Sequence, residues 1–322
     1  MTGLPPGGGR QTAPPLVAIA GPTGTGKSGL SLELAERLTA HGGPPVEIVN
    51  ADAMQLYRGM DIGTAKLAVE ERRGIPHHLL DVLEVSEAST VADYQADARA
   101  VIADIQSRGA VPILVGGSGL YLSAVLHDFR FPGTDPALRA ALEEELAALG
   151  SETLWQRLRD RDAEAAAAID SGNGRRVVRA LEVIQLTGRP YSASLPDESR
   201  QWRPATVLLL DVPASGREGL KEVLAGRARG MFAGGLLDEV RALRDRGLEQ
   251  GVTARRAIGY AQALAVLRGR QSLEEAVDET IQLTWRYVRR QRSWFARWGD
   301  AVRLPAGDPG LVDAAVSAVV PR

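Results

Sequence analysis

A short glycine-rich segment, residues 21–28, constrains this chain more than any other part of it. The segment reads GPTGTGKS and matches the pattern G-x-x-x-x-G-K-[ST] at every fixed position. An apolar run at residues 16–20 precedes it, and leucines at helical spacing follow it. Glycines let backbone N–H groups curl around an anion, and the N-terminus of a helix adds its dipole. The segment therefore predicts a phosphate-binding loop between a strand and a helix.

The loop residues also indicate how a phosphate would be held. Lys27 supplies a mobile positive charge, and the hydroxyl of Ser28 is placed to hold Mg²⁺, the one cofactor that we expect. The residues expected to bind the phosphates make up the whole loop: Gly21, Pro22, Thr23, Gly24, Thr25, Gly26, Lys27 and Ser28. An NTP hydrolase usually adds an aspartate at the end of a buried strand, but the strand predicted at residues 111–115 is followed by Gly-Gly-Ser. Two ligands remain open, the nucleotide of a small-molecule kinase and a diphosphate that leaves from another substrate.

Alternating strand and helix patterns around the loop predict the fold class. Apolar runs at residues 16–20, 46–49 and 111–115 are typical of buried strands, and helical patterns separate them. This order is typical of an α/β fold, a P-loop NTPase-like parallel sheet with covering helices. Further on, we expect a strand at 207–212 and helices at 219–246, at 256–267 and from Ser272 onward, where Glu275 completes a capping box.

Changes in composition divide the chain into segments. Residues 1–14 are rich in proline and glycine, and we expect a disordered leader there. Residues 130–203 are alanine-rich and helical, so we interpret them as a helical insertion domain within a catalytic core formed by 15–129 and 204–322. No apolar run approaches the roughly 20 residues that cross a bilayer. We expect a soluble, cytoplasmic protein without membrane contact, with a monomer as the default.

Charge and cysteine content exclude several classes of protein. The chain has no cysteine, which excludes disulfides, thiolate zinc sites and cysteine nucleophiles. The formal net charge is only −2, so bulk basicity does not indicate a nucleic-acid partner. Arginines are nevertheless crowded into two stretches, 175–203 and 286–297. Each stretch is either an RNA-facing surface or an ordinary solvated helix face.

Asp52 lies three residues after the second predicted strand. In open α/β sheets, chemistry takes place in the crevice beyond the carboxyl ends of the strands, which places Asp52 beside the phosphate loop. A carboxylate there can accept a proton from an attacking amine or hydroxyl, or help to hold a metal ion. A turn or helix-capping aspartate is the alternative.

Several further segments make the pattern specific, and with them the chain resembles the tRNA dimethylallyltransferase (isopentenyl-tRNA transferase) family. They occur in order between about residues 16 and 298. Besides the phosphate loop they are DAMQLYRGMDIGTAK (52–66), PHHLLD (76–81), VGGSGLY (115–121), RALEV (179–183), GLLDEV (235–240), AIGY (257–260) and RQRSWF (290–295). The stretch DIGTAK is the most specific, whereas the phosphate loop alone is shared with many unrelated enzymes.

The resemblance implies transfer of a dimethylallyl group from dimethylallyl diphosphate to N6 of the adenosine 3′ of the anticodon. The phosphate loop and Mg²⁺ would neutralise the departing diphosphate. Asp52 matches the family's catalytic aspartate, which binds the N6 amine and takes its proton. Ser118 matches a position facing the acceptor, and Arg256 matches an arginine near the diphosphate and the tRNA. These three form the expected catalytic set.

The family's contacts with the anticodon stem-loop of tRNA carry over to two parts of the chain. The implied tRNA-binding residues are Asp52, Ala53, Met54, Gln55, Ser118, Arg139, Arg175, Arg176 and Arg256. The acceptor base must leave its stack to reach such a crevice. Three departures from the family pattern are Ala53 in place of serine, Gly119, which would loosen its segment, and Ala261 in place of a basic residue. We expect these substitutions to weaken tRNA affinity without changing the reaction.

Three other functions remain as alternatives. A prenyltransferase for free nucleotides would share the catalytic segments but would not need an arginine-bearing insertion. A small-molecule kinase would use the loop for ATP. A non-enzymatic RNA-binding module would retain the loop without a catalytic use.

Overall fold

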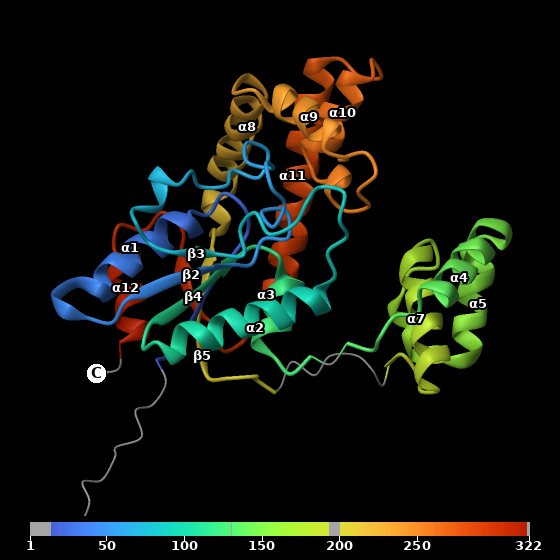
Figure 1. The fold of residues 1–322 in the computed structure, drawn as a ribbon, viewed down its shortest axis with the longest axis horizontal. Coiled ribbons are helices and arrows are strands. Elements are labelled where there is room, and N and C mark those ends of the chain that lie inside the picture. The colour runs from blue at the N-terminus through green and yellow to red at the C-terminus, as the bar shows by residue number, and fades with distance from the viewer. Residues whose placement is uncertain (1–13, 130, 193–199, 321–322) are drawn as a thin grey trace, which may run out of the picture. The chain divides into compact units, whose positions relative to one another are not determined.

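The computed structural model describes residues 14–129, 131–192 and 200–320 (Figure 1). The predicted disordered leader lies outside these residues except for its last residue, Pro14. The chain divides into two compact units: a core unit that runs up to Leu126 and resumes at Trp202, and an insertion unit, His127–Gln201. The sequence interpretation placed the insertion at residues 130–203.

The core unit is built on a six-stranded sheet in the order β3-β2-β4-β1-β5-β6. All of its neighbouring strands are parallel. The strands are β1 (Leu16–Ala20), β2 (Val46–Asn50), β3 (His77–His78), β4 (Val111–Gly116), β5 (Ala205–Asp211) and β6 (Val302–Pro305). In the centre, Val17 of β1 lies opposite Ile113 of β4 on one side and Thr206 of β5 on the other. The predicted parallel α/β fold is therefore confirmed, and the carboxyl ends of the central strands meet at one edge.

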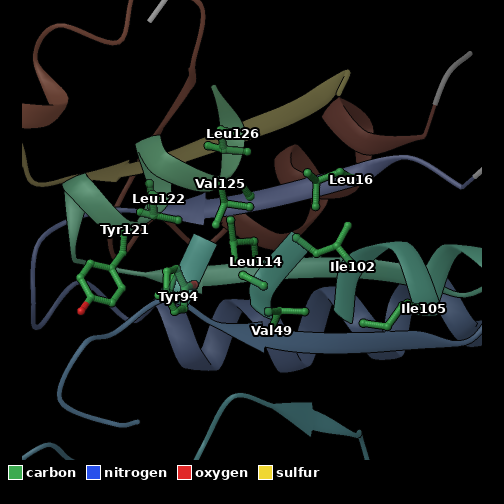
Figure 2. Packing of buried hydrophobic residues seen from close by; sticks show 14 of the residues in the cluster. Leu16, Val49, Tyr94, Ile102, Ile105, Leu114, Tyr121, Leu122, Val125 and Leu126 are labelled. Atoms are coloured by element: carbon green, nitrogen blue, oxygen red, sulfur yellow. The ribbon is translucent and has the colours of Figure 1, made fainter. Parts of the chain in front are cut away.

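Helices cover both faces of the sheet because its central strands are apolar on both faces. Alternate strand residues face α2 (Val91–Ser107) and α3 (Gly119–Leu126) on one side. Figure 2 shows this cluster, which contains Leu16, Val49, Tyr94, Ile102, Ile105, Leu114, Tyr121, Leu122, Val125 and Leu126. The remaining strand residues, such as Val17 and Ile113, pack with α1 (Lys27–Thr39) and α12 (Leu311–Val319). Thr90 caps α2, because its side chain accepts a hydrogen bond from the backbone N–H of Asp93.

The C-terminal helices form a third apolar cluster above the strand ends. They are α8 (Arg217–Ala233), α9 (Leu236–Asp245), α10 (Tyr260–Leu267) and α11 (Leu273–Phe295). The single helix predicted at 219–246 is wrong, because the chain breaks at Gly235, whose φ of 102° is left-handed. The predicted start of a helix at 256 is also wrong, since Gly259 has a φ of 91° and α10 begins after it. The capping box of Ser272 and Glu275 is confirmed at the start of α11.

The insertion unit consists of four described helices around its own apolar core. They are α4 (Pro136–Leu149), α5 (Ser151–Arg161), α6 (Ala163–Ala168) and α7 (Gly174–Thr187). Asp135 caps α4, with Pro136 in its first turn. The core includes Leu142, Leu154, Leu158, Val177 and Leu181.

Short 3₁₀ turns complete the described structure: η1 (Ala40–Gly42), η2 (Glu70–Arg72), η4 (Ala214–Gly216) and η5 (Ala254–Arg256). Within the described ranges, no helix is both long and apolar enough to cross a membrane.

Candidate functional site

The glycine-rich loop connects β1 to α1, as the sequence predicts. Its glycines are required by space and by backbone conformation: a Cβ at Gly21 would lie 2.6 Å from the carbonyl oxygen of Leu210, and Gly26 has a φ of 86°. The hydroxyl of Thr25 and the ammonium of Lys27 both donate to the carbonyl of Pro22, at 2.9 and 2.7 Å. The loop is thus a closed turn at the N-terminus of α1, a geometry suited to an anion.

A pocket of about 250 Å³ opens over this loop. Its walls come from the loop, from the carboxyl ends of β2 and β4, from residues 64–67 and from α8. The predicted site residues that line it are Thr23, Gly24, Gly26, Lys27, Ser28, Asp52 and Gln55. The phosphate loop and the predicted catalytic aspartate therefore share one pocket.

Backbone hydrogen bonds fix Asp52 at the end of β2. Its carboxylate accepts from the backbone N–H of Met54 at 2.9 Å, and its own N–H donates to the side chain of Asn50 at 2.9 Å. The Asn50 amide donates in turn to the carbonyls of Asp52 and Leu79. The half-buried carboxylate is held in a tight turn whose outer face borders the pocket.

Two basic side chains in the pocket oppose Asp52. Burial lowers the pKa of Lys27 to about 8; the charge of Asp52 acts to raise it, and that of Arg227 acts to lower it further. Burial also lowers the pKa of Arg227, against the opposite effect of Asp52. The site therefore has two cations and one carboxylate around a small volume, which favours a bound anion next to a proton acceptor.

Arg227 is a site residue that sequence reasoning missed. It lies on α8, where its guanidinium donates to the hydroxyl of Thr23 at 3.4 Å and to the carbonyl of Thr64 at 3.2 Å. The predicted arginine, Arg256, is exposed in η5 and is not among the residues that line the pocket. Arg227 follows no sequence pattern that distinguishes it from its neighbours, so only the packing of α8 identifies it.

Ser118 follows β4 and lies beside the turn that carries Asp52. Its hydroxyl accepts from the backbone N–H of Ala53 at 3.4 Å. The hydroxyl of Tyr287 of α11 lies close to it. Burial and the charge of Asp52 raise the pKa of Tyr287 to about 12. The structure therefore places Ser118 beside the turn that carries Asp52. Ser118 follows Gly117, which lines the pocket, but is not itself among the lining residues.

Hydrogen bonds and ion pairs hold the segment 52–66 in place, and some of them come from the segments 76–81 and 235–240. The buried ammonium of Lys66 donates to Asp61, to Asp81 and to the carbonyl of Tyr57, at 2.7, 2.5 and 2.9 Å. Glu239 of α9 accepts from the backbone of this segment. The segments DIGTAK, PHHLLD and GLLDEV therefore contact one another in the structure. Together they hold one wall of the pocket.

The predicted tRNA-binding residues fall into two groups. Ala53, Met54 and Gln55 form the turn after Asp52 in the core unit, where the Gln55 amide donates to the carbonyl of Thr64. In the insertion unit, the other group includes Arg175 and Arg176, which are exposed in the first turn of α7. Arg139, by contrast, forms an ion pair with the fully buried Glu182 at 2.6 Å.

The residues around the loop fit a magnesium ion that is coordinated mostly by phosphate oxygens and water and only in small part by the protein. Mg²⁺ usually retains several waters and binds one or two protein groups together with phosphate oxygens. The exposed Ser28 lines the pocket at the start of α1, next to the anion-binding turn. Among the described residues, no cluster of three or more histidine, cysteine or acidic side chains forms a metal site. A hydroxyl beside a phosphate cradle is a donor set typical of Mg²⁺ rather than of a metal enclosed by protein.

Comparison with known proteins identifies relatives along almost the whole chain. The sequence matches the family model described as IPP transferase over residues 55–298. A tRNA dimethylallyltransferase of Clavibacter sepedonicus is 57% identical, covering 95% of this chain and 98% of the relative. One of Thermobifida fusca is 55% identical, covering 94% of each chain.

Solved structures show the same similarity in three dimensions. A full-length tRNA isopentenylpyrophosphate transferase of Bacillus halodurans is 37% identical with a TM-score of 0.65, covering 95% of this chain and 96% of that one. A eukaryotic dimethylallyltransferase acting on tRNA has a TM-score of 0.77 at 27% identity, covering 94% of this chain and 76% of that one.

Proposed function

The chain belongs to the IPP transferase family, and on that basis we propose that this tRNA prenyltransferase uses dimethylallyl diphosphate and modifies N6 of the adenosine 3′ of the anticodon. The observation that carries this proposal is the single pocket shared by the phosphate loop and Asp52. An anion site for a leaving group and a carboxylate for an attacking amine are the two groups that such a transfer requires.

The donor half of the site would bind the diphosphate. The backbone of the loop, Lys27 and Arg227 provide positive charge where the oxygen of the breaking allylic C–O bond becomes negative. Ser28 would hold Mg²⁺ together with the diphosphate, and the bound ion would supply further charge neutralisation there. The diphosphate leaves with the electron pair of that bond.

The acceptor half would bind the adenine. The carboxylate of Asp52 accepts a hydrogen bond from the N6 amine and takes its proton as the new N–C bond forms, which typically contributes about 10²–10⁴ in rate. Ser118, beside Ala53, offers a hydroxyl to the base. The base must be unstacked to enter, as is usual for recognition of RNA loops.

The insertion unit would contact the backbone of the anticodon stem-loop. Arg175 and Arg176 are exposed side by side at the N-terminus of α7, where the helix dipole also favours a phosphate. Contacts of this kind fix the orientation of the RNA rather than its sequence.

Mass spectrometry of nucleosides tests the proposal. Purified protein is incubated with Mg²⁺, dimethylallyl diphosphate and either unmodified tRNA or AMP. We expect N6-(dimethylallyl)adenosine from tRNA alone. Product from AMP but not from tRNA would favour a free-nucleotide prenyltransferase, and phosphoryl transfer from ATP without any prenylated product would refute the proposal.

A further inference from the structure

Gln291 of α11 connects the phosphate loop to the loop that carries Ser118. Its side-chain oxygen accepts from the backbone N–H of Thr23 at 3.0 Å, and its side-chain nitrogen donates to the carbonyl of Gly117 at 2.8 Å. The residue is 5% exposed and far from both partners in sequence. One buried amide therefore joins a residue that lines the anion site to a residue next to the acceptor site.

The orientation of this amide is determined by its partners. The backbone of Thr23 can only donate at its nitrogen, and the carbonyl of Gly117 can only accept, so oxygen and nitrogen of the side chain cannot exchange places. Glutamate would retain the first bond and lose the second. Methionine has nearly the same shape and would lose both.

The same face of α11 closes against the Ser118 loop. A Cβ on Gly117 would lie 2.5 Å from the Gln291 nitrogen, and a Cβ on Gly119 would lie 2.4 Å from the ring of Trp294. One turn before Gln291, the hydroxyl of Tyr287 lies close to that of Ser118. The expectation that Gly119 loosens its segment is therefore wrong, because the absence of a side chain there allows a close contact with α11.

We propose that Gln291 is a positioning residue that keeps the diphosphate and the acceptor adenine in register, an inference that rests on the proposed function. It does not line the pocket. Its two hydrogen bonds fix the spacing between the loop that holds the leaving group and the loop that faces the nucleophile. Transfer depends on this spacing, because the carbon that leaves the diphosphate must lie in line with N6.

Two variants, Gln291→Met and Gln291→Glu, remove the connection while Lys27, Arg227 and Asp52 remain. We expect kcat for tRNA prenylation to fall by about 10- to 100-fold, because misplacement of reacting groups by about 1 Å has effects of this size. The KM for dimethylallyl diphosphate and the binding of inorganic diphosphate should stay close to the wild-type values. The matched control is Gln282→Met, an exposed glutamine on the same helix.

Steady-state kinetics and titration with inorganic diphosphate are carried out on the wild type and the three variants. A fall in kcat with retained diphosphate binding in both Gln291 variants supports the proposal. The proposal is overturned if Gln291→Met keeps the wild-type kcat or if the variants change only KM. It is also overturned if both variants lose diphosphate binding, because Gln291 would then only maintain the fold. If the wild-type protein makes no prenylated tRNA, the proposed function fails. If the wild-type protein is active and the Gln291 variants have the same kinetics as the wild type, only this inference fails.

Discussion

Glu239 accepts a hydrogen bond from the hydroxyl of Tyr260 at 2.5 Å, and the same carboxylate accepts from the backbone N–H groups of Asp61 and Ile62 at 3.2 and 2.8 Å. Burial and the charge of Glu239 both raise the pKa of Tyr260, so this hydroxyl remains a donor at all working pH values. The pair thus joins α9 and α10 to the segment that forms one wall of the pocket. Three parts of the chain distant in sequence depend on one carboxylate.

Replacing Glu239 by alanine tests this connection. The change removes the acceptor of the Tyr260 hydroxyl and of three backbone N–H groups, those of residues 61–63, so we expect the free energy of unfolding to fall by about 1–3 kcal/mol. Chemical denaturation measures it. The neighbouring Asp238→Ala, which removes an exposed ion pair with Arg241, is the control and should change stability by less than about 1 kcal/mol. Equal effects of the two substitutions would contradict the assignment.

Asp52→Asn should separate the chemistry from the binding of the donor. The amide cannot take a proton, so we expect the rate of tRNA prenylation to fall by about 10²–10⁴. The affinity for inorganic diphosphate should remain or rise, because a negative charge beside Lys27 and Arg227 is removed. Single-turnover kinetics and a diphosphate titration provide the two measurements. Retention of the wild-type rate would exclude Asp52 as the proton acceptor.

Diphosphate affinity should depend on pH through Lys27. The anion favours the protonated ammonium, whose pKa is lowered to about 8, so binding should be undiminished at pH 7 and should weaken as pH rises through about 8. Titration of inorganic diphosphate at several pH values measures this. In Lys27→Arg the guanidinium stays charged throughout, and any ionisation of the ligand appears equally in both proteins. The same pH dependence in both would show that Lys27 is not its cause.

Arg175 and Arg176 should contribute to tRNA affinity by neutralising phosphates. For the double alanine variant we expect weaker tRNA binding and a smaller slope of log K against log salt, by about 0.7–0.9 for each phosphate that is no longer neutralised. Filter binding at several salt concentrations measures both quantities. Arg161→Ala, which alters another exposed arginine of the insertion unit, is the control. An unchanged slope in the double variant would exclude the two arginines from the RNA interface.

Arg139 should behave differently from these arginines because it has a partner inside the insertion unit. Glu182 is fully buried and bonded to both Arg139 and Arg179. Arg139→Ala would leave this carboxylate with Arg179 as its one ionic partner, so we expect a loss of about 1–3 kcal/mol in the free energy of unfolding. Chemical denaturation of Arg139→Ala and Arg161→Ala makes the comparison. Unchanged stability with weakened tRNA binding would instead assign Arg139 to the RNA.

The sequence predicted the central architecture because the determinants of that architecture are local. The glycine-rich loop, the strands β1, β2 and β4 and the capped helices α2 and α11 each have a pattern within a short window, and the structure has all of them. The strands β3 and β6 were not predicted. Each is too short for a periodic pattern, with two and four residues, and is defined only by the neighbour with which it pairs.

The electrostatic part of the pocket was less accessible to sequence reasoning. Lys27 and Asp52 stand in motifs, whereas Arg227 stands in a helix with other arginines and enters the site only because α8 packs over the loop. The connection through Gln291 likewise joins residues at opposite ends of the chain. Such contacts depend on tertiary packing, and no local pattern specifies them.

The position of β1 between β4 and β5 has a consequence for biosynthesis. Leu16 pairs with Ala205, so β1 receives this neighbour only after the whole insertion unit has been translated. Pairings of such high contact order are slow to form, and an open strand edge is prone to aggregation in the meantime. The insertion unit, which has its own apolar core, is therefore fully translated before that edge is covered.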